Sequence, residues 1–234
     1  MELQGTWKHD SKVNFVVTSE RHSLVATASD SCSQAIRVYY LDIDDISNSA
    51  YQTYTGDRAN ERSQEMRPGD KWAYYPATIQ WGRSDSVASF LAVGYSPRSV
   101  TGNDNDIPDD KVNTGELCIW DVGTGLRVPF HAARTQNVFE IIWHPSQPML
   151  LAATSPAGPC ESDTKTQIRI FALNEVGAFL QIKSLDCPAI DVNELTIRPL
   201  GLVDCYVTAS CTDGATYVWD TAQGDDAIHV LRHG

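Results

Sequence analysis

Four short segments spread along the chain share one pattern, and this repetition constrains the fold more than any other feature. In each segment an aromatic residue follows an aliphatic residue one position earlier, and an aliphatic residue or Thr three positions earlier. The four aromatic residues are Tyr39, Trp120, Phe171 and Trp219. Such period-2 patterning is typical of β-strands with two different faces. Its recurrence predicts a chain built from repeated structural units.

The sequence around each aromatic segment predicts a unit of four strands. Upstream of each aromatic residue lie an apolar run, a turn, and a second run rich in small residues, such as 150–155 and 206–210. A turn and a weaker fourth strand follow, as at 126–130, 179–182 and 228–231. No segment shows helical periodicity, so we expect each unit to be a four-stranded antiparallel sheet. Because such a sheet cannot bury both of its faces alone, neighbouring sheets are expected to stack.

The composition is compatible with a folded core and argues against several classes of protein. The chain has 234 residues, of which 42% are hydrophobic. It has no apolar run long enough to span a membrane, and its first residues do not resemble a secretory signal. Its net charge of −12 disfavours direct binding to nucleic acid. The six cysteines have no C-x-x-C spacing, and the chain has no N-x-S/T site. We therefore expect an intracellular protein, cytoplasmic or nuclear, with reduced thiols.

These repeats resemble those of the WD40-repeat β-propeller family. Two repeats end in Trp-Asp, like the terminal dipeptide of the family. Asp213, six residues before Trp219, matches its turn Asp, and His9 matches its opening His. The matched positions, with Tyr39 and Phe171 standing where Trp is expected, are His9, Tyr39, Trp120, Asp121, Phe171, Asp213, Trp219 and Asp220. Arg134 and Pro188 stand where the family has a His. The family's hydrogen-bond network of His, Ser, Asp and Trp is therefore incomplete, and we expect the blades to be held mainly by apolar packing.

The resemblance implies an all-β fold, with a single WD40-type β-propeller over residues 1–234. Its four blades are expected at 10–57, 72–131, 137–186 and 191–232. Rings of this type usually need about seven blades, so four blades leave the ring incomplete. We expect the N-terminal part of a longer propeller. The alternative is that two half-rings associate through their open edges into an eight-bladed ring.

Two insertions in the repeats are the candidate binding segments. In the family, the loop that leads into the next repeat lies on the same face as the loop between the second and third strands, and partners usually bind this face. A mixed-charge insertion at 57–71 and an acidic one at 97–114 both fall there, and a milder loop spans 156–166. Loops on a rigid scaffold often carry binding residues. The candidate partner-binding residues are Arg62, Arg67, Trp72, Asp104, Asp106, Asp109 and Asp110.

Each insertion also has a simpler interpretation. The acidic insertion begins like a calcium loop, but Pro108 occupies a ligand position, and the required Gly and terminal Glu are missing. We therefore expect a solvated, partly disordered loop there, and a solvated connection in the mixed-charge insertion. Trp72, with Tyr74 and Tyr75, is expected to pack on the edge of a blade rather than to anchor a partner.

The sequence shows no catalytic, cofactor-binding or metal-binding signature. The motifs G-x-S-x-G and H-E-x-x-H and a glycine-rich phosphate loop are all missing. His131 and His144 are expected to be structural, and the histidines and cysteines form no metal-binding pattern. We therefore predict a non-catalytic scaffold, without cofactor, that presents loops to protein or peptide partners in a multi-subunit complex.

Two alternative functions remain open. One is a substrate receptor of a ubiquitin ligase or of a chromatin-modifying complex. The family's docking signature for that role has an Arg two residues after Trp-Asp, where this chain has Gly123 and Ala222. The other is a propeller enzyme whose catalytic site is dispersed over several blades.

Overall fold

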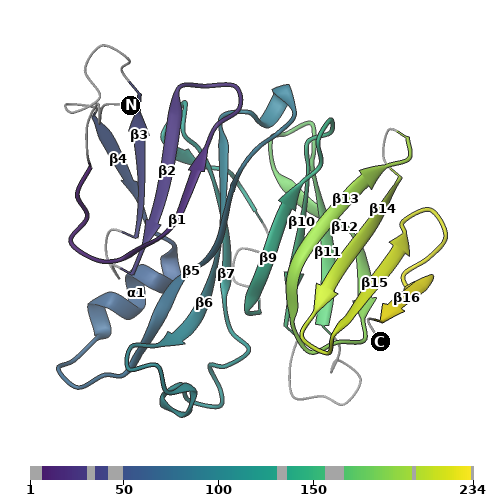
Figure 1. The fold of residues 1–234 in the computed structure, drawn as a ribbon. Helices are drawn as coiled ribbons and strands as arrows, with labels where there is room; N and C mark the ends of the chain where they lie inside the picture. The colour runs from purple at the N-terminus through teal and green to yellow at the C-terminus, as the bar shows by residue number, and fades with distance from the viewer. Residues whose placement is uncertain are drawn as a thin grey trace, which may run out of the picture.

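Four antiparallel sheets of four strands follow one another along the chain (Figure 1). The computed structural model describes residues 7–30, 35–41, 50–130, 136–155, 166–201 and 204–232. Within each sheet the strands pair in the order of the sequence. The predicted all-β fold of four four-stranded blades is therefore confirmed.

The strands of the four blades have the following bounds. The first blade contains β1 (Val13–Thr18), β2 (Leu24–Ser29), β3 (Ile36–Tyr40) and β4 (Tyr51–Tyr54). The second contains β5 (Trp72–Trp81), β6 (Phe90–Ser99), β7 (Glu116–Asp121) and β8 (Leu126–Arg127). The third contains β9 (Val138–Trp143), β10 (Met149–Thr154), β11 (Thr166–Leu173) and β12 (Phe179–Cys187). The fourth contains β13 (Val192–Pro199), β14 (Cys205–Cys211), β15 (Ala215–Asp220) and β16 (His229–Arg232).

The repeated aromatic residues are buried in the third strand of each blade. Tyr39, Trp120, Phe171 and Trp219 are at most 5% exposed. The last three belong to apolar clusters that each join a blade to the preceding one. The repeated pattern therefore marks the contact between neighbouring blades, which is why one blade could not bury its faces alone.

Close contacts between inner strands reinforce the apolar clusters. The Trp81 indole N–H donates to the Val17 carbonyl of the preceding blade, and the Trp143 indole N–H donates to the Gln80 carbonyl, both at 3.2 Å. In the second strand of the second blade, a Cβ atom at Gly94 would lie 2.5 Å from a methyl carbon of the third blade. Only glycine allows the two blades to approach this closely.

The first strand of each blade lies innermost and carries a β-bulge. Strand β9 contacts both β5 and β13. In each blade one residue of the first strand has no partner in the ladder with the second strand. From the first blade to the fourth, these residues are Asn14, Ala77, Phe139 and Asn193. A bulge bends its strand and redirects a side chain. Each first strand therefore has one residue outside the ladder, near the start of the strand or at its middle.

Polar contacts in the first blade go beyond the apolar packing that we expected. His9 Nε2 lies 2.9 Å from the Thr27 hydroxyl oxygen and 3.1 Å from the Tyr39 hydroxyl oxygen. Burial lowers the pKa of His9, which favours the neutral imidazole in this contact. Tyr39, which stands where the family pattern has a Trp, therefore makes the hydrogen bond expected of that Trp. The contact with His9 is kept although the residue type differs.

The aspartates of the repeat pattern make local contacts that hold turns. The Asp213-Gly214 turn between β14 and β15 places Gly214 at a φ of 77°, a conformation that glycine adopts without strain. Each of the three carboxylates accepts a hydrogen bond within its own blade. The Ser89 hydroxyl donates to Asp121 at 2.7 Å, and the Tyr217 hydroxyl donates to Asp213 at 2.7 Å. The Ala222 N–H donates to Asp220 at 3.0 Å.

Two details of the predicted secondary structure were wrong. Residues Asp57–Glu65 form a helix, α1, although no helix was expected. Ala59 is the only buried residue of this helix, so the sequence carries no apolar periodicity that could reveal it. The fourth strand expected at 126–130 ends at Arg127, because Pro129 has no N–H to donate to a ladder.

The four blades form an open arc, with the first blade at one end and the fourth at the other (Figure 1). The predicted incomplete ring is therefore confirmed. Short 3-10 turns, η2 (Asp85–Val87) and η3 (Asp104–Asp106), complete the secondary structure of the described residues. None of the described helices is long and apolar enough to cross a membrane.

Candidate partner-binding face

The two insertions lie on the same side of the arc, at the lower edge of Figure 1. The first insertion contains α1, and the second follows β6 and contains η3. We call this side the insertion face. Residues 156–165 of the third predicted loop, together with His131 and Arg134, lie outside the described residues.

The α1 helix is anchored at its N-terminus by a buried carboxylate. Glu116, which is 0% exposed, accepts hydrogen bonds from the backbone N–H groups of Asp57 (3.1 Å) and Arg58 (2.8 Å). The Arg127 guanidinium lies 2.7 Å from the same carboxylate and 2.6 Å from Asp57. A negative charge at this end satisfies free N–H groups and interacts favourably with the helix dipole. The first insertion is therefore fixed to the second blade and is not the solvated connection that we expected.

Aromatic residues of β5 support the other part of the helix. The Arg62 guanidinium lies 4.4 Å from the Trp72 ring centre, donates to the Trp72 carbonyl and pairs with Asp70 at 2.9 Å. Tyr74 and Tyr75 are 5% and 7% exposed. Arg62 and Trp72 are thus used within the chain, and the tyrosines pack on the blade. The Arg67 N–H donates to the Asp70 carboxylate at 3.1 Å, which orders the turn after the helix.

The acidic insertion is organised around Asp106 rather than being a loop without structure. The Asp106 carboxylate accepts hydrogen bonds from the hydroxyls of Thr101 and Ser99 and lies 3.6 Å from Lys71 Nζ. The hydrogen bond from Thr101 makes the largest contribution to lowering its pKa. The order of this segment was missed because Lys71 belongs to the other insertion, and because no local pattern shows that Ser99, at the end of β6, bonds to Asp106.

The other acidic candidates do not converge on Asp106. Asp109 and Asp110 are exposed, and Asp110 pairs with Lys111 at 2.8 Å. The backbone of Asp104 begins η3, and its side chain lies outside the description. Among the described residues, no group of three or more His, Cys, Asp or Glu side chains is placed to hold a metal ion.

A groove of about 600 Å³ opens on the inner side of the insertion face. The bulge residues Ala77, Phe139 and Asn193 line it, so three blades contribute to its walls. Ile107 and Val112 of the acidic insertion add apolar side chains at its rim. The groove is thus formed by the innermost strands together with an insertion. The sequence did not predict it, because a bulge is defined only once two strands are paired.

Polar and charged residues also contribute to the lining of the groove. The Asn137 Oδ1 atom is buried and has no hydrogen-bond partner among the described residues. Arg98 and Asp191 contribute opposite charges to the lining, and the Arg98 side chain is 51% exposed. An unpaired buried acceptor is costly, and a donor that reached this oxygen would relieve that cost.

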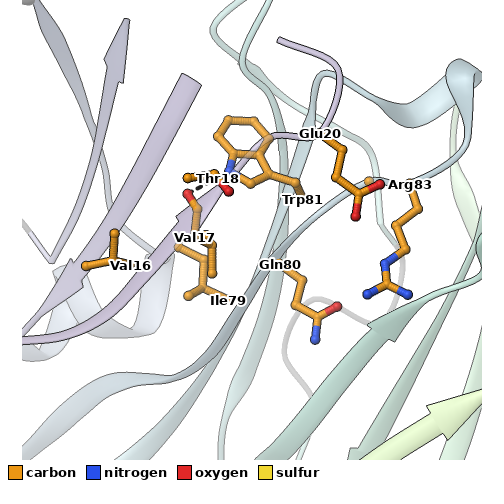
Figure 2. Close-up of a pocket in the computed structure, with 9 residues that line it drawn as sticks. Val16, Val17, Thr18, Glu20, Ile79, Gln80, Trp81 and Arg83 are labelled. Atoms are coloured by element: carbon orange, nitrogen blue, oxygen red, sulfur yellow. Dashed lines mark hydrogen bonds between the residues drawn. The ribbon is translucent and has the colours of Figure 1, made fainter. Parts of the chain in front are cut away.

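A second hollow, of about 340 Å³, lies between β1 and β5 (Figure 2). Its lining includes Val17, Trp81, Glu20 and Arg83, and Figure 2 shows the indole of Trp81 directed at the Val17 carbonyl. Neither insertion contributes to this hollow. We therefore regard the groove at the insertion face as the better candidate site.

His144 has a structural environment. It is fully buried, and its Nδ1 atom accepts hydrogen bonds from the backbone N–H groups of Ser146 (3.2 Å) and Gln147 (3.0 Å). Burial lowers its pKa, so the neutral ring that this turn requires is favoured.

Comparisons with known proteins identify the fold. No family model matches the chain. Rik1-associated factor 1 of Schizosaccharomyces pombe is 26% identical over 162 residues, which are 68% of this chain and 23% of that protein. The Dos1 propeller superposes with a TM-score of 0.67 at 20% identity, covering 95% of this chain and 48% of that one. The β-propeller domain of Cps50 (Swd1) from Myceliophthora thermophila gives 0.57 at 13% identity, covering 92% and 57%.

The two solved structures share one fold, and all three matches are longer than this chain. The two solved structures are β-propellers, and both cover nearly all of this chain. The chain spans less than a quarter of the curated relative and about half of each solved propeller.

Proposed function

We propose that this chain, an open four-bladed arc of a WD40-type β-propeller, is a non-catalytic scaffold that binds an extended segment of a protein partner in the groove at the insertion face. The observation that carries the proposal is the groove itself, which three blades and the acidic insertion line together. A rigid propeller that presents an adaptable loop beside a preformed groove suits peptide recognition.

The chemistry of the groove supports binding rather than catalysis. Its walls combine apolar surface from Phe139, Ile107 and Val112 with a buried acceptor on Asn137. Among its described lining residues Asp191 is the one carboxylate, and no histidine is present. General acid–base catalysis usually needs two suitably placed titratable groups. An extended peptide instead needs apolar contacts and a few groups that satisfy its backbone.

Two further observations support a partner inside a larger intracellular assembly. The curated relative is named for its association with another protein, Rik1. The described cysteines, Cys118, Cys187, Cys205 and Cys211, are free and buried. Free thiols are usual in reducing compartments.

The groove can be tested with peptides selected from a random phage-displayed library against the purified chain. Asn137→Ala and Val112→Asp are each expected to lower the affinity of a selected peptide about tenfold or more, because one removes an acceptor and the other puts a charge at an apolar rim. Fluorescence anisotropy would measure the affinity. Val176→Asp is the matched control, since Val176 is 83% exposed and does not line the groove. Equal affinities for all variants would place the peptide elsewhere and refute the proposal.

Deleting residues 102–111 is expected to leave the fold intact and to weaken peptide binding. Shortening a surface loop costs little entropy, and the deleted segment supplies Ile107 to the groove. A thermal melt checks the fold, and anisotropy with the selected peptide checks the groove. Loss of a cooperative melt would show that the insertion is needed for folding.

A further inference from the structure

Two cysteines from different blades meet in the interior beneath the insertion face. Cys187 is the last residue of β12 in the third blade, and Cys211 is the last residue of β14 in the fourth. Their Sγ atoms are 3.8 Å apart, and the two residues are 0% and 5% exposed. Both belong to the apolar cluster that joins these two blades.

The thiol pair lies next to one wall of the groove. Cys211 is paired with Val192 across the sheet, and the N–H of the following residue, Thr212, donates to the Asp191 carbonyl at 3.3 Å. Val192, Asp191 and Thr212 all line the groove. A covalent link between the two sulfurs would therefore fix the third blade to the fourth at this wall.

We propose that Cys187 and Cys211 are an oxidation site, at which a peroxide converts the two thiols into a disulfide between the third and fourth blades. This site is independent of the peptide-binding proposal. A disulfide requires sulfurs about 2.05 Å apart, so the observed separation must close by about 1.8 Å. Both strands end at these residues, so the required movement falls on strand ends rather than on strand centres.

The environment of the pair defines the order of the chemical steps. The contact with the Cys211 sulfur lowers the pKa of Cys187, which favours Cys187 as the nucleophile. Cys187 first loses its proton to solvent, and its thiolate attacks one oxygen of the peroxide. The O–O bond breaks, the sulfur becomes a sulfenic acid, and the leaving hydroxide takes up a proton from solvent to form one water. Cys211 then attacks that sulfur, its proton leaves with the hydroxyl as a second water, and the S–S bond forms. Two thiols are oxidised and one peroxide is reduced.

The other described thiols lack these features. Burial raises the pKa of Cys118, which lies 3.1 Å from an Arg127 nitrogen, and burial also raises the pKa of Cys205. The Thr221 hydroxyl donates to the Cys205 sulfur at 3.8 Å. Neither has another cysteine sulfur in contact among the described residues, so both serve as internal references.

The test is treatment of the purified chain with hydrogen peroxide, followed by alkylation of the remaining thiols and peptide mapping by mass spectrometry. We expect one linked species that joins the peptides of Cys187 and Cys211, with a loss of two hydrogens. The Tm should rise by about 5 °C on oxidation, and dithiothreitol should reverse both changes. Alkylation of both thiols after oxidation, conversion of Cys187 to a sulfinic acid, or a link to any other cysteine would refute the site.

Cysteine variants distinguish a disulfide between Cys187 and Cys211 from oxidation at other residues. Cys211→Ser should abolish both the linked peptide and the oxidation-dependent rise in Tm, while Cys205→Ser should leave both unchanged. If the buried hydroxyl of the serine variant prevents folding, Cys211→Ala replaces it in the test. A Cys211 variant that still gains stability on oxidation would contradict the assignment.

Discussion

Replacing Trp219 with alanine is expected to lower the free energy of unfolding by about 3–5 kcal/mol. The indole is 0% exposed and packs in the cluster between the third and fourth blades. Its N–H also donates to the Asp186 carbonyl of the third blade at 3.2 Å. The alanine variant loses the buried ring, leaves a cavity between blades and removes the hydrogen bond. Urea unfolding followed by circular dichroism measures the change.

Two controls separate these contributions. Trp219→Phe retains most of the apolar contact but loses the hydrogen bond, so it should cost less than the alanine variant. Val176→Ala changes a side chain that is 83% exposed and should alter stability by less than about 0.5 kcal/mol. If Trp219→Ala unfolded at the same urea concentration as the Val176 control, Trp219 would not be a core residue of the blade.

The sequence could predict the blades because their main signal is local. Aliphatic and aromatic residues alternate within each third strand, so strand and buried face follow from a few neighbouring positions. Trp120, Phe171 and Trp219 then pack toward the preceding blade, as a repeat that cannot bury itself requires. Tyr39 kept the same place although its residue type differs, because its hydroxyl still reaches His9.

The groove could not be predicted in this way because its residues share no local pattern. The bulge positions are Asn14, Ala77, Phe139 and Asn193, which have no common size or polarity. A bulge is a property of two paired strands and not of one segment. Asn137 has an unsatisfied oxygen only because of how the chain packs around it.

The α1 helix was missed for a related reason. A helix that buries one alanine has no apolar face that marks it in the sequence, and its stability depends on a distant strand. Arg127 and Glu116 of the second blade supply the charges that hold it. From the sequence, these two residues belong to ordinary strand positions.

Replacing Glu116 with alanine is expected to lower the free energy of unfolding by about 3 kcal/mol, near the lower end of values for broken buried ion pairs. The change leaves two backbone N–H groups of α1 without an acceptor and removes the buried partner of Arg127. Arg127 remains 27% exposed and keeps Asp57, which limits the cost. Urea unfolding measures the loss, and hydrogen exchange should show faster exchange at the Asp57 and Arg58 amides.

The matched control is Asp57→Asn, which acts on the same arginine from the surface. The Asp57 side chain is 58% exposed and 2.6 Å from Arg127, and exposed ion pairs contribute at most about 1 kcal/mol. A Glu116→Leu, Arg127→Met double variant should recover part of the stability lost in Glu116→Ala, because it leaves no buried charge without a partner. If Glu116→Ala were no more costly than Asp57→Asn, the buried carboxylate would not be the anchor. The contacts of α1 with β5, such as the stacking of Arg62 on Trp72, would then hold the helix.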